Sequence, residues 1–245
     1  GVSIRTARGV IESIARPVNV YRKSLGKPEL GKIEHGTAVK QERGSLTLEE
    51  VSRVVAYTGD LRARLIVLLG TLAGLRMGEC RGLMVEDVDT DKGELVIRHN
   101  VVYMSEGVKV PKGKDARTVP ASPVLLDAIE AVQAVYPGKF VVPNLADPES
   151  PSDISTFRRA FPRVLRAIGI SKEEQAARRL VYHSTRHTFI TITQKVGFSE
   201  FVAQYLAGHK DIKVTRRYTH ADGQIDMREV GDTIEAAVKK AGKAK

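Results

Sequence analysis

The sequence predicts a mainly helical protein with one small three-stranded antiparallel β-sheet, an α+β fold. Two observations favour this class. Apolar residues recur at helical spacing through most of the 245-residue chain, whereas residues 93–122 hold β-branched and aromatic residues in short runs separated by turn formers. Hydrophobic residues make up 42% of the chain and charged residues 28%, an ordinary globular composition with enough apolar material for one or two cores.

The N-terminal segment is expected to be helical. Apolar residues in 3–25 follow a helical stripe, within which Pro17 predicts a kink or a boundary. Residues 26–45 are rich in glycine and charge without a sustained period, so we expect a linker. The chain starts without methionine in what reads as the middle of a helix, and we expect a fragment of a longer protein.

A second domain is expected at 46–245. Thr47 followed by Glu50 is a capping-box signature that opens a helix. The run from 65 to 75 is nearly all apolar, which predicts a helix buried on most sides and ending near Gly74. After the predicted sheet, helical spacing returns in 122–137, 155–170, 184–197, 199–208 and in an amphipathic tail within 221–245.

Charge and cysteine content restrict the class of function. A formal charge of +10 and a pI near 9.7 attract polyanions, of which nucleic acid is the commonest in cells, although a merely soluble basic protein fits equally well. The single cysteine, Cys80, excludes an internal disulfide, and no Cys and His cluster has zinc spacing, so we expect a reducing, intracellular setting. No apolar run reaches the roughly 18 residues of a membrane span, and the N-terminus has no apolar signal core.

Two arginines are candidate phosphate ligands. In YHSTRH, His183 and Arg186 are three apart at the expected start of a helix, where Ser184 would be the cap; the alternative is a solvated surface charge beside that cap. Arg76 follows the apolar helix, and Glu79 is placed to hold its guanidinium. This pair is either a structural ion pair or a rigid fork for two phosphate oxygens.

Two further segments carry candidate chemistry. His209 is followed nine residues later by Tyr218, which basic residues flank; it is either a half-buried packing residue or a phenolate nucleophile toward phosphorus. In a predicted hairpin, Lys112 could donate a proton to a departing sugar oxygen, whereas Lys114 at the tip is expected to be solvated.

Together, Arg76 in GLRMGE, Lys112 in a hairpin, H-x-x-R at 183–186, and GH nine residues before Tyr218 resemble the tyrosine recombinase, or phage integrase, family over residues 46–220. Gly78, where many relatives have a small hydroxyl residue, and Ala207, where an aliphatic residue is common, depart from its pattern outside the catalytic positions. The resemblance implies a catalytic domain at 46–245, and residues 1–25 then read as the C-terminal remnant of a helical core-binding domain.

The resemblance also implies roles for individual residues. Tyr218 attacks the scissile phosphate to give a 3′-phosphotyrosine, and no metal or other cofactor is required. The implied catalytic set is Arg76, Lys112, His183, Arg186, His209 and Tyr218, with Lys114, Arg117 and Arg216 as DNA contacts and Glu79 and His187 as structural support.

The expected partners are double-stranded recombination sites, accessory DNA-bending proteins and further copies of the chain, coupled in a tetramer by the tail at 221–245. Docking of the tail in a neighbouring protomer is favoured over docking in its own domain. The expected location is the cytoplasm, with the nucleoid. Site-specific recombination through a Holliday junction is the leading function, and the alternatives are type IB topoisomerase activity and a non-catalytic DNA-binding relative.

Overall fold

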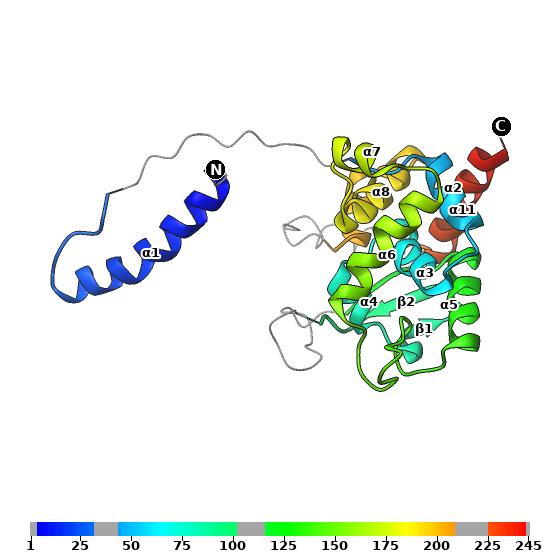
Figure 1. Cartoon of the computed structure of the whole chain (residues 1–245), viewed down its shortest axis with the longest axis horizontal. Coiled ribbons are helices and arrows are strands. Elements are labelled where there is room, and N and C mark those ends of the chain that lie inside the picture. Colours follow the sequence, from blue (N-terminus) through cyan, green and yellow to red (C-terminus); the bar gives the residue numbers. More distant parts are fainter. Residues whose placement is uncertain (1–3, 32–43, 102–115, 209–224, 244–245) are drawn as a thin grey trace. The chain divides into compact units, whose positions relative to one another are not determined.

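The computed structural model describes residues 4–31, 44–101, 116–208 and 225–243 (Figure 1). The chain forms two compact units, 1–42 and 43–245. In the first unit, helix α1 (Ile4–Ser24) continues through Pro17, so of the two alternatives predicted for that proline, a kink or a boundary, the boundary is wrong. A proline removes one backbone hydrogen bond from a helix, but it does not prevent the residues beyond it from being helical.

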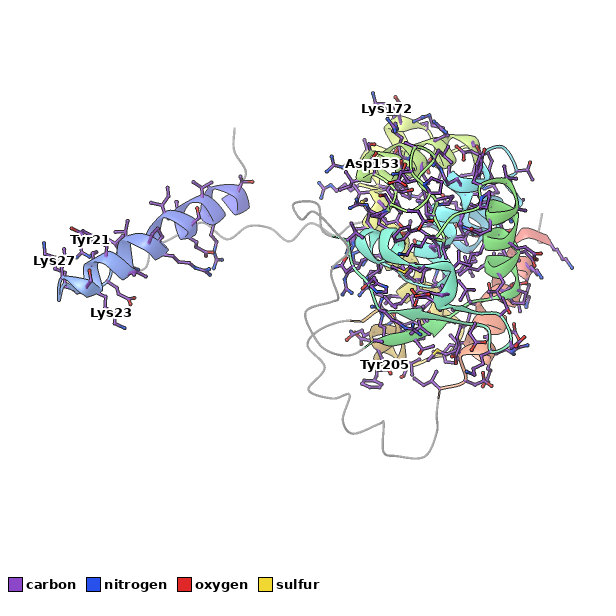
Figure 2. All side chains as sticks on the ribbon, turned by 90° about the horizontal axis from the view of Figure 1, so that it is seen from below. Tyr21, Lys23, Lys27, Asp153, Lys172 and Tyr205 are labelled. Carbon is purple, nitrogen blue, oxygen red and sulfur yellow. The ribbon has the colours of Figure 1, made fainter. Side chains whose placement is uncertain are left out.

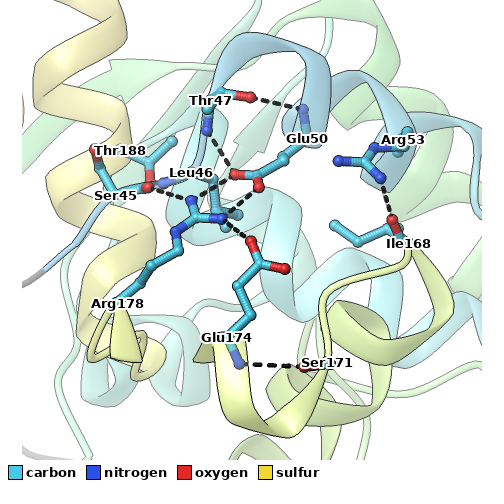
Figure 3. Close-up of polar contacts among 10 residues, drawn as sticks. All are labelled: Ser45, Leu46, Thr47, Glu50, Arg53, Ile168, Ser171, Glu174, Arg178 and Thr188. Carbon is cyan, nitrogen blue, oxygen red and sulfur yellow. Dashed lines mark hydrogen bonds and ion pairs between the residues drawn. The ribbon is translucent and has the colours of Figure 1, made fainter. Parts of the chain in front are cut away.

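The second unit opens with α2 (Leu48–Ala56), and its predicted capping box is confirmed. Thr47 Oγ1 accepts from the backbone N–H of Glu50 at 3.2 Å, and Glu50 Oε2 accepts from that of Thr47 at 2.8 Å. Arg178, at the end of α7 (Lys172–Ala177), donates to both carboxylate oxygens of Glu50 (Figure 3). The start of α2 is thereby bound to a segment more than a hundred residues away in the chain.

Helix α3 (Leu61–Leu72) forms the centre of the core, as its apolar sequence predicts. Asp60 caps it by accepting from the Ala63 N–H at 2.9 Å, and every residue from Leu65 to Leu72 is buried. It contacts α2 and α4 (Met77–Gly82), and also α5 (Pro123–Val135), α6 (Ile154–Ala167) and α8 (Tyr182–Lys195). From Leu65 to Leu72 the helix has no polar face, because every one of these residues is buried.

The sheet is three-stranded and antiparallel in the described residues, as predicted, but its strands differ from those expected. Its order is β1 (Val88–Asp89), β2 (Glu94–Ile97) and β3 (Arg117–Pro120), with β1 directly after a short 3-10 turn (Val85–Asp87). The first strand precedes the segment in which all three were predicted. Two residues are too few to produce a recognisable alternation of apolar and polar side chains. The residues between β2 and β3, at 102–115, lie outside the described part.

The tail forms α11 (Met227–Lys243), which packs on α2, α5 and β3 of its own unit (Figure 1). Glu235 also accepts from the Val124 N–H at 2.8 Å, and so caps the N-terminus of α5. The side chains that face the core share helical spacing; they are Met227, Val230, Ile234 and Val238. Within one chain the tail therefore docks in its own domain, whereas the sequence favoured a neighbouring protomer.

Side chains fill the interior between these helices and the sheet (Figure 2). No helix in the described part of the chain is long and apolar enough to cross a membrane.

Candidate active site

The turn between α3 and α4 positions the first predicted site residue, Arg76. Gly74 ends the preceding helix with φ +67°, a conformation that favours glycine, and a Cβ at this position would lie 2.5 Å from the ring of Phe189. Arg76 is the N-cap residue of α4, and Glu79 in the first turn accepts its backbone N–H at 2.8 Å and its Nη1 at 2.9 Å. The predicted ion pair is present, and the Arg76 side chain keeps 37% exposure.

Glu79 has a second arginine partner. Arg117, the first residue of β3, donates from Nη1 to Oε1 at 2.8 Å and from Nη2 to Oε2 at 2.7 Å. Burial alone would raise the pKa of Glu79, but the hydrogen bonds and charge of Arg117, together with Arg76, lower it to about 2. The carboxylate is therefore ionised at any pH at which the protein would work.

Arg186 is the most buried of the predicted site residues that the structure describes. It is 2% exposed, and its Nη1 donates to the Gly74 carbonyl at 2.9 Å. Its Nη2 is buried and has no hydrogen-bond partner among the described residues. Burial first, and then the nearby charge of Arg76, lower its pKa to about 9, so it remains a cation at neutral pH. A buried cation with an unpaired donor is a site prepared for an anion.

The start of α8 differs from the prediction in one respect. The N-cap is Val181, and Ser184 lies in the first helical turn, where its hydroxyl accepts from the Val181 N–H at 3.2 Å. Ser184 thus helps to close the helix end, but from inside the helix, so its assignment as the N-cap residue is wrong. His183 is exposed, and its ring meets that of His187 edge-on with centroids 5.1 Å apart.

Tyr182, in the same segment, is a packing residue. It is buried, its hydroxyl donates to the Ile66 carbonyl at 3.2 Å, and it lies 3.1 Å from the Cys80 sulfur. Burial raises the pKa of Tyr182 well above its ordinary value and that of Cys80 to about 12. A tyrosine held in this protonated form is unsuited to attack on phosphorus.

The C-terminal end of α9 (Glu200–Leu206) also reaches this cluster. Arg76 Nη2 donates to the Gly208 carbonyl at 2.6 Å, and Arg117 Nε donates to the Leu206 carbonyl at 3.2 Å. The structure therefore gathers Arg76, Glu79, Arg117 and Arg186 from α4, β3 and α8, and it fixes the segment that leads into His209. The other predicted site residues, Lys112, Lys114, His209, Arg216 and Tyr218, lie outside the described residues.

Sequence reasoning missed the backbone part of the cluster. The carbonyls of Gly74 and Gly208 each accept from a site arginine, and both glycines have positive φ. The available signal was a glycine directly after a helical segment, since such a glycine leaves backbone carbonyls free of helical bonds.

This arrangement can bind and polarise a phosphate. Arg76 is accessible and Arg186 has a free donor, so two guanidiniums can neutralise charge on nonbridging oxygens. In the described part of the chain, no group of three or more His, Cys, Asp or Glu side chains could hold a metal ion.

Comparisons with known proteins agree with the family resemblance seen in the site residues. Residues 45–224 match the model of the phage integrase family. The chain is 28% identical over 244 residues to tyrosine recombinase XerA of Pyrococcus horikoshii, covering 97% of this chain and 75% of that protein. It is 31% identical over 193 residues to tyrosine recombinase XerC of Halalkalibacterium halodurans, covering 74% and 59% respectively.

Two solved structures share the fold. An integrase of transposon Tn1549, in complex with circular intermediate DNA, matches with a TM-score of 0.69 at 20% identity, over 93% of this chain and 78% of that one. A crystal structure of XerA recombinase matches with a TM-score of 0.57 at 20% identity, over 94% and 75%.

The family model covers most of the chain, and the fold agrees with that of solved integrases, so the resemblance based on the site residues is confirmed. The chain belongs to the phage integrase family and is a tyrosine recombinase, an enzyme that breaks and rejoins DNA.

Proposed function

We propose that this recombinase acts on double-stranded DNA sites through a 3′-phosphotyrosyl intermediate formed by Tyr218. The proposal rests on two site arginines that differ in exposure. Arg186 is buried with a free Nη2, and Arg76 is accessible but fixed by Glu79. One phosphate between them would have both nonbridging oxygens neutralised, which stabilises the charge that builds up when phosphorus is attacked.

The remaining roles follow the chemistry of a transesterification. The Tyr218 oxygen forms a bond to the scissile phosphorus, while the bond from phosphorus to the 5′-oxygen breaks. His183 assists removal of the phenolic proton or positions the phosphate, and Lys112 gives a proton to the leaving oxygen. His209 donates a hydrogen bond to a nonbridging oxygen. Because the ester keeps the energy of the broken diester, resealing by a 5′-hydroxyl needs no ATP.

The wider reaction is recombination between two sites through a Holliday junction, with four copies of the chain on DNA. The Tn1549 integrase, whose structure contains circular intermediate DNA, supports the choice of DNA sites as substrates. To couple the copies, the amphipathic helix α11 would leave α2, α5 and β3 of its own unit and dock in a neighbour, and accessory DNA-bending proteins would assist. The cytoplasm, with the nucleoid, stays the predicted location.

The proposal is tested with a nicked suicide duplex. A target is first selected from random duplexes by binding to the full-length protein, and the nick is placed so that the short fragment bearing the freed 5′-hydroxyl diffuses away. We expect the unmutated protein to form a covalent adduct with the DNA, resistant to denaturant and sensitive to protease. The Tyr218→Phe variant should form none.

Adduct formation by Tyr218→Phe would show that another residue is the nucleophile. Absence of an adduct with the unmutated protein, on a site that it binds, would contradict the proposal as a whole. If the protein relaxed any supercoiled plasmid without site preference, this result would indicate a topoisomerase and not a recombinase.

A further inference from the structure

Arg117 is bonded to the protein through every nitrogen of its guanidinium. Nη1 and Nη2 each donate to one oxygen of Glu79, and Nε donates to the Leu206 carbonyl. Its side chain is 17% exposed, against 37% for Arg76. An arginine that contacts DNA needs donors directed at the phosphate, whereas these donors are directed inward.

These bonds join three segments, each of which leads to a residue of the proposed mechanism. Arg117 begins β3 five residues after Lys112; Glu79 in α4 holds Arg76; and Leu206 ends α9 three residues before His209. Arg76 completes the connection by donating to the Gly208 carbonyl. The three segments come from distant parts of the sequence. Strand β3 reaches Glu79 through the two hydrogen bonds that Arg117 donates to the carboxylate.

Gly208 fits this contact closely. Its φ is +65°, and a Cβ there would lie 2.9 Å from Cζ and Nε of Arg117. A side chain would therefore push the guanidinium away from Glu79, in addition to straining the backbone. The absence of a side chain at Gly208 therefore leaves room for the Arg117 guanidinium.

We propose that Arg117 is a positioning residue, which fixes Arg76 through Glu79 and fixes the C-terminal end of α9, three residues before His209 in the sequence, through the Leu206 carbonyl. This role replaces the DNA contact predicted from the sequence, and it rests on the proposed function of Arg76 and His209. Lysine cannot replace arginine here, because a point charge cannot bond two carboxylate oxygens and a backbone carbonyl in one plane.

The test compares single-turnover cleavage of the suicide duplex by the full-length protein and its variants. Arg117→Met should cleave on the order of 10²-fold more slowly, as expected when a catalytic group is misplaced by about 1 Å, while its affinity for the duplex changes by less than about threefold. Arg117→Lys should be intermediate. The matched control is Arg178→Met, because Arg178 also binds a glutamate in two places but links α2 to α7. It should lower the melting temperature without changing the cleavage rate.

The pH profile separates positioning from loss of folding. The titratable or charged groups around Glu79 are Arg76 on its own helix, Arg117 from β3, Arg186 and Tyr182 from α8, and Cys80 beside it. In Arg117→Met, burial of Glu79 persists while its main partner is lost, so its pKa should rise. Cleavage should then fall as the pH drops from about 7 to about 5, and Arg117→Met combined with Glu79→Gln should lose this dependence.

The possible outcomes are distinct. An adduct from the unmutated protein, combined with normal rates and flat pH profiles in both Arg117 variants, would overturn the positioning role but leave the proposed function intact. Weakened DNA affinity at an unchanged cleavage rate would restore the predicted DNA contact and overturn the proposal. If Arg117→Met does not fold, Arg117→Lys decides by the same two readouts.

Discussion

At the scale of single residues, Glu79 organises the site. Its two oxygens accept four hydrogen bonds, from the backbone and side chain of Arg76 and from two nitrogens of Arg117. A buried carboxylate without such partners would be protonated or would destabilise the fold, whereas a saturated one holds its arginines in a single geometry.

Glu79 should make the free energy of unfolding depend on pH in the acid range. Its pKa of about 2 lies below the ordinary 4.5, so its contribution is fully present above about pH 4.5 and is lost as pH falls toward 2. The contribution is on the order of 3 kcal/mol. The free energy of unfolding in urea, measured at several pH values, should differ between the unmutated protein and Glu79→Gln at about pH 7, and much less at about pH 2. Glu149→Gln, at an exposed position, is the control. A difference that stays constant with pH would contradict this assignment.

Replacing Arg186 by another cationic residue should lower the cleavage rate. Arg186→Lys keeps a charge but replaces the two separate donor nitrogens, Nη1 on the Gly74 carbonyl and the unpaired Nη2, by a single nitrogen, so single-turnover cleavage should fall about 10²- to 10³-fold. Arg53→Lys, which alters an arginine bonded to the Ile168 carbonyl, is the control and should keep the cleavage rate. An unchanged cleavage rate in Arg186→Lys would show that the Arg186 guanidinium does not stabilise the transition state.

At the scale of elements, the site depends on how closely α3 approaches α8. Gly70 faces Thr185, and a Cβ on Gly70 would lie 2.1 Å from the Thr185 hydroxyl oxygen. That hydroxyl donates to the Tyr182 carbonyl at 2.7 Å, so Thr185 cannot move without disturbing the first turn of α8. Close packing here positions α8, and with it Arg186, against the turn that carries Arg76.

Gly70→Ala should therefore destabilise the protein by about 1 to 3 kcal/mol, because the added methyl overpacks the contact between the helices. Thr185→Ala in the same chain should restore part of this loss by removing the nearest clashing atom, the hydroxyl oxygen, while the Thr185 Cβ at 2.6 Å stays in place. A double-mutant cycle of unfolding free energies measures the coupling. Simple addition of the two single effects would show that the helices do not meet at this point in solution.

At the scale of the whole molecule, a formal charge of +10 suits a protein that holds DNA. The charge does not specify a sequence, because contacts to phosphate position a protein whereas base contacts and DNA deformability give preference. Helix α11 adds a second property at this scale. It covers α2, α5 and β3 and caps α5 through Glu235, so exchange of tails between copies would require each chain to release these contacts.

Binding to DNA without the target site should weaken steeply with salt. Each lysine or arginine that neutralises a phosphate releases counterions, so affinity should fall by about 10³-fold between about 50 and about 200 mM salt. Fluorescence anisotropy with a random duplex measures the slope. Tyr218→Phe should give the same slope, since binding needs no cleavage. A salt-independent affinity would mean that contacts other than phosphate neutralisation dominate.

Local signals in the sequence predicted individual helices well. The Thr47 and Glu50 capping box and the buried helix before Gly74 depend on residues within a few positions of one another, and both are present. The prediction failed where a local signal was weak or misleading. The strand Val88–Asp89 has only two residues, and Ser184 has the side chain of a cap residue but lies inside the helix that it was expected to open.

The fold class, the family and the pairing of Arg76 with Glu79 follow from the order of residues along the chain, because helical periodicity, motif order and an i to i+3 ion pair are local patterns. Three features of the site follow from packing instead: Arg117 turns inward to Glu79, Arg186 is buried with a nitrogen that has no partner among the described residues, and the carbonyls of Gly74 and Gly208 accept from the site arginines. The partners in these contacts are tens of residues or more apart in sequence, and whether an arginine faces DNA or a buried carboxylate depends on which segments the packed core brings together.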